Sequence, residues 1–187
     1  KLDISEALRQ VSPQRAAYAL RYRRELDQRL SLAVFLLLQQ ALREEYGLKE
    51  VPEFAFGPNG KPYLKDREDL HYNLSHSGRY VVLAWGDTAV GVDVQRHDAD
   101  ANTQAIGKRF FAPDELQYIQ GDRNRFYEIW TKKESFLKYT GKGLRAGLDS
   151  FSVLAPERKI RYFCRTLGTD YSLSLCTEAD AWEIELL

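Results

Sequence analysis

Residues 130–144, WTKKESFLKYTGKGL, carry the strongest signal in this sequence. Trp130, Glu134 and Lys138 follow at intervals of four, so on a helix they form one stripe, with Lys133 beside it. A Glu–Lys pair on a solvated helix face is worth about 0.3–0.5 kcal/mol and explains only two of these residues. It explains neither the tryptophan nor the Gly-Lys-Gly that follows. A carboxylate for a metal, two lysines for phosphates and a glycine-rich exit together indicate phosphoryl-transfer chemistry.

A second polar motif, Gly91-Val92-Asp93-Val94-Gln95, precedes this helix. Alternation along a strand places Asp93 and Gln95 on one face, opposite the two valines. Oxygen ligands of this kind suit Mg²⁺, which takes one or two carboxylates together with waters and substrate phosphates. An exposed edge strand with polar outer residues is the alternative.

Two further motifs are rich in turn-forming and polar residues. Residues 73–78, NLSHSG, offer hydroxyls, an imidazole and backbone N–H groups to a phosphate, although a serine-rich turn with one capped histidine explains them equally well. Adjacent Ser75 and His76 do not face each other easily and no G-x-S-x-G motif is present, which disfavours a Ser-His-Asp hydrolase. Residues 59–63, NGKPY, expose Lys61 on what is otherwise an ordinary turn.

The composition is that of a folded protein and excludes several classes. Of the 187 residues, 27 are Lys or Arg and 27 are Asp or Glu, so the formal net charge is zero, and 44% are hydrophobic. Neutrality argues against nucleic-acid binding through a general excess of positive charge. The longest apolar run, residues 33–38, is far shorter than the ~20 residues of a membrane span, and the N-terminus is too polar for a secretion signal. Two cysteines indicate no disulfide framework, so we expect a cytoplasmic protein.

The elements expected along the chain repeat. A helix begins at Ser12-Pro13 and no breaker follows before Gly47, although the arginine-rich stretch 15–29 leaves open a separate first helix. Gly86-Asp87 predicts a tight hairpin between strands 80–85 and 88–94, and residues 124–139 predict a second long helix.

The two halves of the chain show the same order of elements. Helix 29–46 corresponds to helix 126–139, and strand 80–85 corresponds to strand 171–176. We therefore predict an α+β fold of two similar halves, residues 1–95 and 96–187, related by a pseudo-twofold axis. A ligand cleft is expected between the halves. We expect a monomer, because the cleft that two subunits would form between them already lies within one chain.

Taken together, the motifs resemble those of the Sfp-type 4′-phosphopantetheinyl transferases, which move the phosphopantetheine arm of coenzyme A onto a serine of a carrier protein. The matching segments are Gly60-Lys61-Pro62, residues 73–77, Gly91-Val92-Asp93, Arg109-Phe110-Phe111, Trp130-x-x-Lys133-Glu134-Ser135 with Lys138, and Gly141-x-Gly143-Leu144. Gly-x-Asp followed about 40 residues later by Trp-x-x-Lys-Glu is the most specific combination.

The resemblance implies a role for each matching residue. The Mg²⁺ ligands would be Asp93 and Glu134, with Gln95 as a third candidate where many family members carry an acidic residue. Phosphate and nucleotide contacts would come from Ser75, His76, Lys133 and Lys138, from Lys61 at the nucleotide end, and from Arg29 and Arg15 at the 3′-phosphate. Glu134 would accept the proton of the carrier serine, and Lys138 would stabilise the leaving 3′,5′-ADP.

Coenzyme A would therefore be the substrate, Mg²⁺ the cofactor and an apo acyl or peptidyl carrier protein the partner, with no role for nucleic acid or a membrane. The carrier is expected to be acidic and to dock on the arginines of the first helix and on residues 109–111. Because Gln95 is a weaker ligand than a carboxylate, a coenzyme A-binding homologue with impaired catalysis is the alternative.

Overall fold

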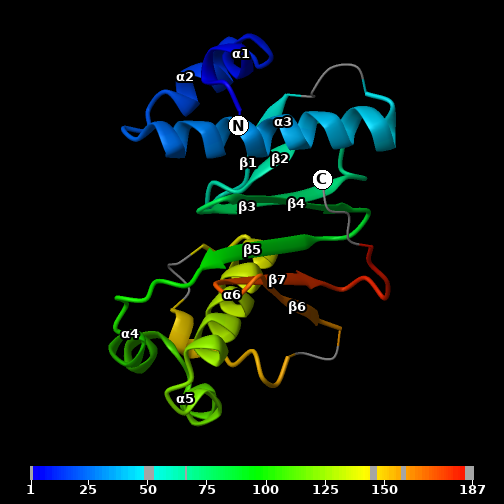
Figure 1. Ribbon diagram of the computed structural model, residues 1–187. Coiled ribbons are helices and arrows are strands. Elements are labelled where there is room, and N and C mark those ends of the chain that lie inside the picture. The colour runs from blue at the N-terminus through cyan, green and yellow to red at the C-terminus, as the bar shows by residue number, and fades with distance from the viewer. Residues whose placement is uncertain (1, 49–52, 66, 144–146, 157–158, 184–187) are drawn as a thin grey trace.

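Two long helices, each packed against antiparallel strands, organise the chain (Figure 1). The computed structural model describes residues 2–48, 53–65, 67–143, 147–156 and 159–183. Helix α3 (Glu25–Tyr46) packs on strands β3 (His71–Ser77) and β4 (Tyr80–Gly86). Helix α6 (Arg123–Thr140) packs on three strands, which are β5 (Val90–Arg96), β6 (Arg161–Leu167) and β7 (Tyr171–Thr177). The α+β class and the division into two similar halves are thus confirmed.

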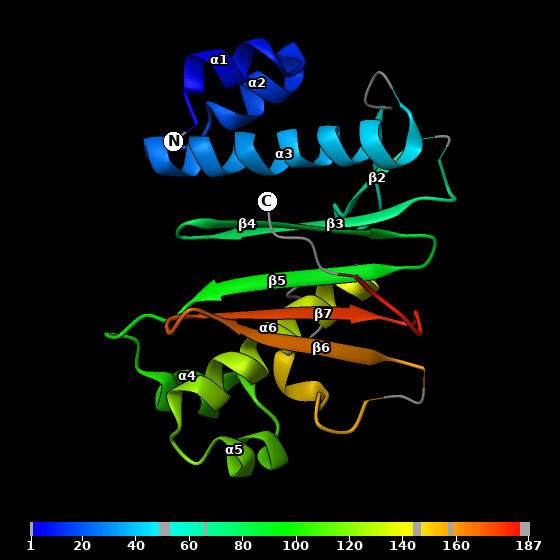
Figure 2. The same ribbon diagram turned by 45° about the vertical axis from the view of Figure 1, so that its right-hand side comes forward.

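The first half begins with two short helices on the side of α3 that faces away from the strands (Figures 1 and 2). They are α1 (Ile4–Arg9) and α2 (Pro13–Ala19), and both contact α3. Ser12 caps α2 by accepting a hydrogen bond from the Arg15 amide, and Pro13 follows at the first helical position, as predicted. Residues 20–24 separate α2 from α3, so the prediction of one continuous helix from Pro13 is wrong and the separate first helix is present.

The second half adds two short helices at the end of the molecule opposite α3 (Figure 2). They are α4 (Thr103–Phe110) and α5 (Pro113–Ile119), and both pack on α6. A 3₁₀ turn, η2 (Leu148–Ser150), contacts α4. The buried core here comprises Phe111, Ile119, Phe126, Tyr127, Ile129 and Val153. The core of the first half comprises Leu38, Leu42, Leu64, Leu70 and Tyr72.

The strand pairing differs from the sequence prediction. Strand β4 pairs with β3, from Ser77↔Tyr80 to His71↔Gly86, and β5 pairs with β7 in a sheet of order β5-β7-β6. The hairpin predicted across Gly86-Asp87 is therefore wrong, because β5 forms its ladder with a strand about 80 residues away. Strand β5, which the predicted first half (residues 1–95) includes, forms its sheet with β7 and β6. A short pair, β1 (Phe54–Phe56) and β2 (Pro62–Leu64), flanks the predicted turn at residues 57–60.

The two halves are joined by side chains of β3 that act as a substitute for a neighbouring strand. Asn73 Oδ1 accepts a hydrogen bond from the Val92 amide (2.9 Å), and Ser75 Oγ accepts one from the Val94 amide (3.2 Å). Ser77 Oγ accepts the third, from the Arg96 amide (3.0 Å). Alternate β5 amides are thus satisfied by alternate β3 side chains, which fixes the register of Asp93 against β3.

Glycine at position 91 lets α6 approach β5 closely. A Cβ there would lie 2.0 Å from the Ser135 carbonyl oxygen and 2.3 Å from the Tyr139 amide nitrogen, both on the backbone of α6. Only a residue without a side chain permits this approach. The close packing brings Lys138 of α6 to the β3–β5 junction, where it contacts Ser75 and Asp93.

Candidate active site at the junction of the two halves

Three elements each contribute one side chain to a buried polar centre. Lys138 Nζ, from α6, donates to Asp93 Oδ1 on β5 (2.7 Å), to Ser75 Oγ on β3 (3.0 Å) and to the Val92 carbonyl (3.1 Å). Ser75 Oγ in turn donates to Asp93 Oδ1 (3.0 Å). Asp93 is 7% exposed, so its charge depends on these partners. The strand β5, the strand β3 and the helix α6 are therefore locked together at one carboxylate.

One oxygen of this carboxylate has no partner. Asp93 Oδ2 is buried and receives no hydrogen bond. Burial raises the pKa of Asp93, and the Lys138 ammonium opposes that rise. Among the described residues, two more buried side-chain atoms lack a partner, the Nε atoms of Arg15 and Arg29. Native proteins leave few buried polar atoms unsatisfied, so one orphaned acceptor and two orphaned donors indicate groups that a ligand could satisfy.

Glu134 lies one helical turn before Lys138 on the same stripe of α6. Burial raises its pKa, and the negative charge of Asp93 raises it further. The second effect means that the Glu134 carboxylate is close enough to Asp93 to sense its charge. Among the described residues, no three His, Cys, Asp or Glu side chains form a metal-binding group.

Gln95 is half-buried on the same face of β5 as Asp93, in agreement with the alternation in the sequence. Its amide nitrogen donates to the carbonyl of its neighbour Arg96 (3.0 Å). The amide oxygen is therefore the atom that Gln95 has to offer a cation.

Basic side chains extend the centre toward the first half. His76 occupies β3 one position after Ser75, and burial, followed by the charge of Lys138, lowers its pKa. Arg15 and Asp27 also act on the pKa of His76, which places the imidazole between the α6 lysine and the α2–α3 region. Arg15 donates to the carbonyl and the hydroxyl of Ser31, and its guanidinium stacks 4.9 Å from the Phe35 ring.

Comparison with known proteins identifies the family of this chain. A family model described as the 4′-phosphopantetheinyl transferase superfamily matches residues 89–185, and a second, described as 4′-phosphopantetheinyl transferase, N-terminal, matches residues 1–87. The chain belongs to this family. The two matches meet between β4 and β5, where the hydrogen-bonded sheets also divide. The chain is accordingly a 4′-phosphopantetheinyl transferase, a class that implies coenzyme A as substrate and a carrier protein as partner.

Curated relatives agree over most of the chain. A 4′-phosphopantetheinyl transferase of Bacillus subtilis is 34% identical over 184 residues, covering 89% of this chain and 81% of the relative. The 4′-phosphopantetheinyl transferase psf-1 of Bacillus pumilus is 33% identical, covering 95% of this chain and 84% of the relative. The 4′-phosphopantetheinyl transferase Sfp of Bacillus subtilis strain 168 is 34% identical over 76% of this chain. No helix in the described part of the transferase is long and apolar enough to cross a membrane.

Two residues of the transferase that were predicted to contact phosphate have other partners in the structure. Lys133 is 1% exposed, and its ammonium pairs with Glu115 (2.8 Å) and donates to the carbonyls of Leu148 and Phe151. Three acceptors use all three of its protons, so Lys133 has none left for a phosphate. The hydroxyl proton of Ser75 goes to Asp93, so this residue orients the centre and has no proton for a phosphate.

Lys61 and Arg29 have structural partners of their own. Lys61 Nζ donates to the carbonyls of Val90 (3.3 Å) and Tyr139 (3.2 Å), which connects the start of β5 to the end of α6. Arg29 pairs with Glu25 one turn earlier on α3. Each keeps donors that these contacts do not use. Leu144, the last residue of the predicted glycine-rich motif, lies outside the described residues.

The structure of the transferase has two cavities lined by residues of the predicted motifs. One, about 330 Å³, lies at the junction of the halves and is lined by Asn59, Lys61, Tyr72, Tyr139 and Gly141 among others. The other, about 300 Å³, is lined by Arg109, Phe110, Trp130, Glu134, Gly147, Leu148 and Asp149. Trp130 and Glu134 of the sequence stripe thus share a cavity wall with Arg109 and Phe110.

Glu115, Asn73 and Ser77 have contacts that sequence reasoning did not assign. The partner of Lys133 is Glu115, which is fully buried. Its only signal in the sequence is its place three residues after Ala112, where a glutamate accepts the amide at the start of a helix. Asn73 and Ser77 were noted as part of a polar motif, but their role as acceptors for β5 depends on a strand pairing that no local pattern reveals.

Proposed function

We propose that this transferase moves 4′-phosphopantetheine from coenzyme A to a serine of an apo acyl or peptidyl carrier protein, with Mg²⁺ as cofactor and 3′,5′-ADP as the product. The observation that carries the proposal is the set of orphaned buried atoms, Asp93 Oδ2 and the Nε atoms of Arg15 and Arg29. An acceptor oriented for a cation and two donors oriented for an anion are what a metal–pyrophosphate substrate requires.

The donor set fits Mg²⁺. Asp93 offers an unpaired, buried carboxylate oxygen, and Glu134 is a second carboxylate nearby. The amide nitrogen of Gln95 is hydrogen-bonded to the Arg96 carbonyl, so its amide oxygen is the atom that would face a cation. Mg²⁺ is bound by one or two carboxylates and completes its shell with waters and substrate phosphates, so two carboxylates suffice. When bound, the ion supplies charge neutralisation for the reacting pyrophosphate.

The basic groups suit the phosphates of coenzyme A. Lys138 sits at the polar centre and neutralises the pyrophosphate, with His76 donating to a phosphate oxygen next to it. Arg15 and Arg29 then meet the 3′-phosphate through their unpaired Nε atoms. Lys61 lines the cavity of about 330 Å³, which receives the nucleotide end. A guanidinium forms strong charge-assisted hydrogen bonds with phosphate, which favours arginine at these positions.

The reaction is an in-line displacement at the β-phosphorus. The serine oxygen of the carrier forms a bond to that phosphorus, the bond to the bridging oxygen breaks, and the electron pair leaves with 3′,5′-ADP. Glu134 accepts the serine proton, directly or through one water. A carboxylate within hydrogen-bond reach of the attacking hydroxyl is the kind of group that does this. Lys138 stabilises the charge that develops on the leaving group.

The cavity lined by Glu134 is where we place the pantetheine arm. Its walls include the apolar side chains of Phe110, Trp130 and Leu148, and Glu134 stands at its edge. An arm of amides and methylene groups gains from such walls while its phosphate end remains at the polar centre.

A mass measurement tests the proposed function. The purified protein is incubated with coenzyme A, MgCl₂ and an apo carrier protein, and the carrier is weighed by mass spectrometry. We expect the mass of one phosphopantetheine to be added, in a stoichiometric relation to the 3′,5′-ADP released. Asp93→Ala is expected to abolish the gain, and full activity of this variant contradicts the metal assignment. Binding of coenzyme A without any modification of the carrier supports instead the impaired homologue suggested by Gln95.

A further inference from the structure

The buried Lys133–Glu115 pair connects three separate parts of the second half. Lys133 lies on α6, and Glu115 lies in the first turn of α5. Both residues also hold the segment that follows α6 along the chain. Lys133 Nζ donates to the Leu148 carbonyl (2.6 Å) and to the Phe151 carbonyl (2.5 Å). Glu115 Oε1 accepts from the Val153 amide (2.8 Å).

Glu115 is also anchored on its own helix. Its Oε2 accepts from the Ala112 amide (2.8 Å) at the start of α5 and receives the Lys133 ammonium at 2.8 Å. The two side chains are 0% and 1% exposed, so water does not compete for these contacts. Phe151 completes the enclosure, with its ring 4.2 Å from the ammonium. A buried pair with every donor used holds its partners in one arrangement.

The segment held in this way forms one wall of the cavity beside Glu134. Gly147, Leu148 and Asp149 line that cavity together with Trp130 and Glu134 of α6. Gly147 has a φ of 68°, in the left-handed region, which lets the chain enter the 3₁₀ turn of the wall. The carbonyl of Leu148, a residue of the wall itself, is the acceptor that Lys133 holds.

We propose that Lys133 and Glu115 are positioning residues that hold residues 147–153 as the wall of this cavity and thereby set the affinity for the pantetheine arm of coenzyme A. The inference rests on the proposed function. It predicts a selective effect, because the wall touches only the part of coenzyme A that 3′,5′-ADP lacks. Loss of the pair weakens the binding of coenzyme A and leaves the binding of 3′,5′-ADP unchanged.

The main test is the double variant Lys133→Met/Glu115→Gln, which removes the ammonium and leaves no unpaired charge in the interior. We expect KM for coenzyme A to rise about tenfold or more, since small displacements of a positioning element cost up to about 100-fold. The inhibition constant of 3′,5′-ADP is expected to stay within twofold of the wild-type value. Lys133→Arg, which keeps a buried cation, is expected to recover part of the loss.

Lys132→Met is the matched control, because Lys132 neighbours Lys133 on α6 and forms its ion pair with Glu128, also on α6. Its KM for coenzyme A is expected to match the wild type. An unchanged KM in the double variant, or equal weakening of coenzyme A and 3′,5′-ADP, overturns the positioning role. Absence of transfer by the wild type contradicts the proposed function itself, which keeps the two failures distinguishable.

Hydrogen exchange on the wild-type protein provides a test that needs no variant. The Val153 amide is expected to exchange slowly because it donates to Glu115 in the interior. Coenzyme A is expected to slow exchange further in a peptide covering residues 147–153, whereas 3′,5′-ADP at saturation leaves that peptide unchanged. Fast exchange of Val153 in the free protein, or equal protection by both ligands, overturns the inference.

Discussion

At the scale of single residues, the site depends on the charge balance between Asp93 and Lys138. The lysine is the only ammonium within ion-pair distance of this carboxylate among the described residues, and Asp93 is almost completely buried. A buried carboxylate without its counterion is expensive, whereas removing both charges together costs little. The pair therefore combines a structural role with its proposed role toward the phosphates.

Lys138→Met separates these two roles. We expect the single variant to lose about 3 kcal/mol of the free energy of unfolding and 100-fold or more in kcat/KM. Asp93→Asn/Lys138→Met is expected to regain most of the stability, because no charge is left unpaired, but none of the activity. Urea unfolding and steady-state kinetics measure the two quantities. A double variant that is as active as the wild type contradicts the assignment of both residues.

Gln95 tests the composition of the metal site. Replacing its amide with a carboxylate in Gln95→Glu adds a charged oxygen on the face of β5 that carries Asp93. The Mg²⁺ concentration for half-maximal activity is expected to fall about tenfold, because Mg²⁺ affinity rises with the number of charged ligands. Gln95→Ala is the control and is expected to leave the thermal midpoint unchanged. The same Mg²⁺ requirement in all three proteins places position 95 outside the metal shell.

At the scale of elements, the decisive contact is the side-chain junction between β3 and β5. Asn73, Ser75 and Ser77 accept the amides of alternate β5 residues, so the strand that carries Asp93 is aligned by the strand that carries His76. The first half thereby controls the position of Asp93, the proposed metal ligand, in the second half.

Asn73→Ala leaves the buried Val92 amide without an acceptor, and we expect a loss of about 1–3 kcal/mol in the free energy of unfolding. Ser77→Ala is the matched comparison, because the Arg96 amide lies in an exposed part of the same junction and water replaces the hydroxyl. It is expected to cost less than about 0.5 kcal/mol. Chemical denaturation measures both free energies of unfolding. Equal losses for the two variants would contradict the expected difference in burial along the junction.

The same elements show what the sequence reveals and what it does not. The helix around Trp130, Glu134 and Lys138 was predictable because its spacing and its Gly141 terminus are local signals. The pairing of β5 was not, because Gly86-Asp87 specifies a turn but not the strand with which each arm pairs. Glu134 and Asp93 were selected from residue type and spacing, and their role toward a metal stays a prediction. The ion pair of Lys133 was not predictable, because its partner Glu115 is buried beside α6 only through the packing of α5.

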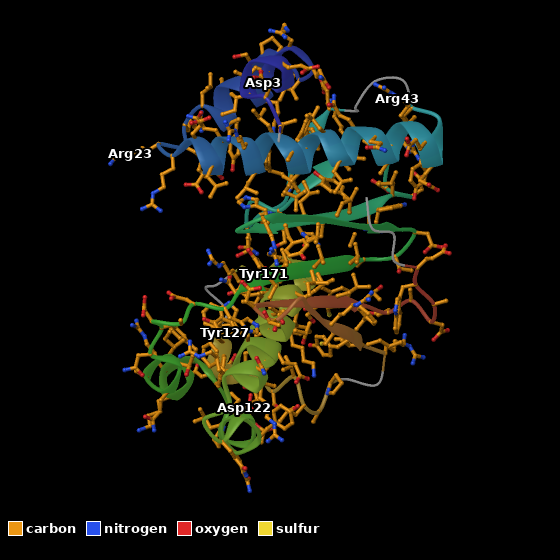
Figure 3. The ribbon with its side chains drawn as sticks, viewed as in Figure 1. Asp3, Arg23, Arg43, Asp122, Tyr127 and Tyr171 are labelled. Carbon is orange, nitrogen blue, oxygen red and sulfur yellow. The ribbon has the colours of Figure 1, made fainter. Side chains whose placement is uncertain are left out.

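At the scale of the whole molecule, a net charge of zero coexists with a basic end of the first half. Arg21, Arg23 and Arg24 are exposed between α2 and α3, where Leu20 and Leu26 are also 52% and 55% exposed. Arg23 projects from this turn, away from the sheets (Figure 3). Exposed cations around exposed leucines suit an acidic partner with an apolar contact, and this supports the proposal that the carrier docks here.

Charge reversal at two ends of α3 tests that proposal. Arg23 lies before the first turn of α3 and Arg43 near its last turn, so Arg23→Glu and Arg43→Glu make the same change in net charge at opposite ends (Figure 3). At low salt, Arg23→Glu is expected to raise KM for the carrier about fivefold with little change in kcat, because a charge at the rim of an interface acts mainly on association. Arg43→Glu is expected to have no effect. The difference should shrink at high salt, where the Debye length falls to about 3 Å at 1 M. Equal KM values for the two variants, or a difference that persists in 1 M salt, exclude electrostatic docking at the α2–α3 turn.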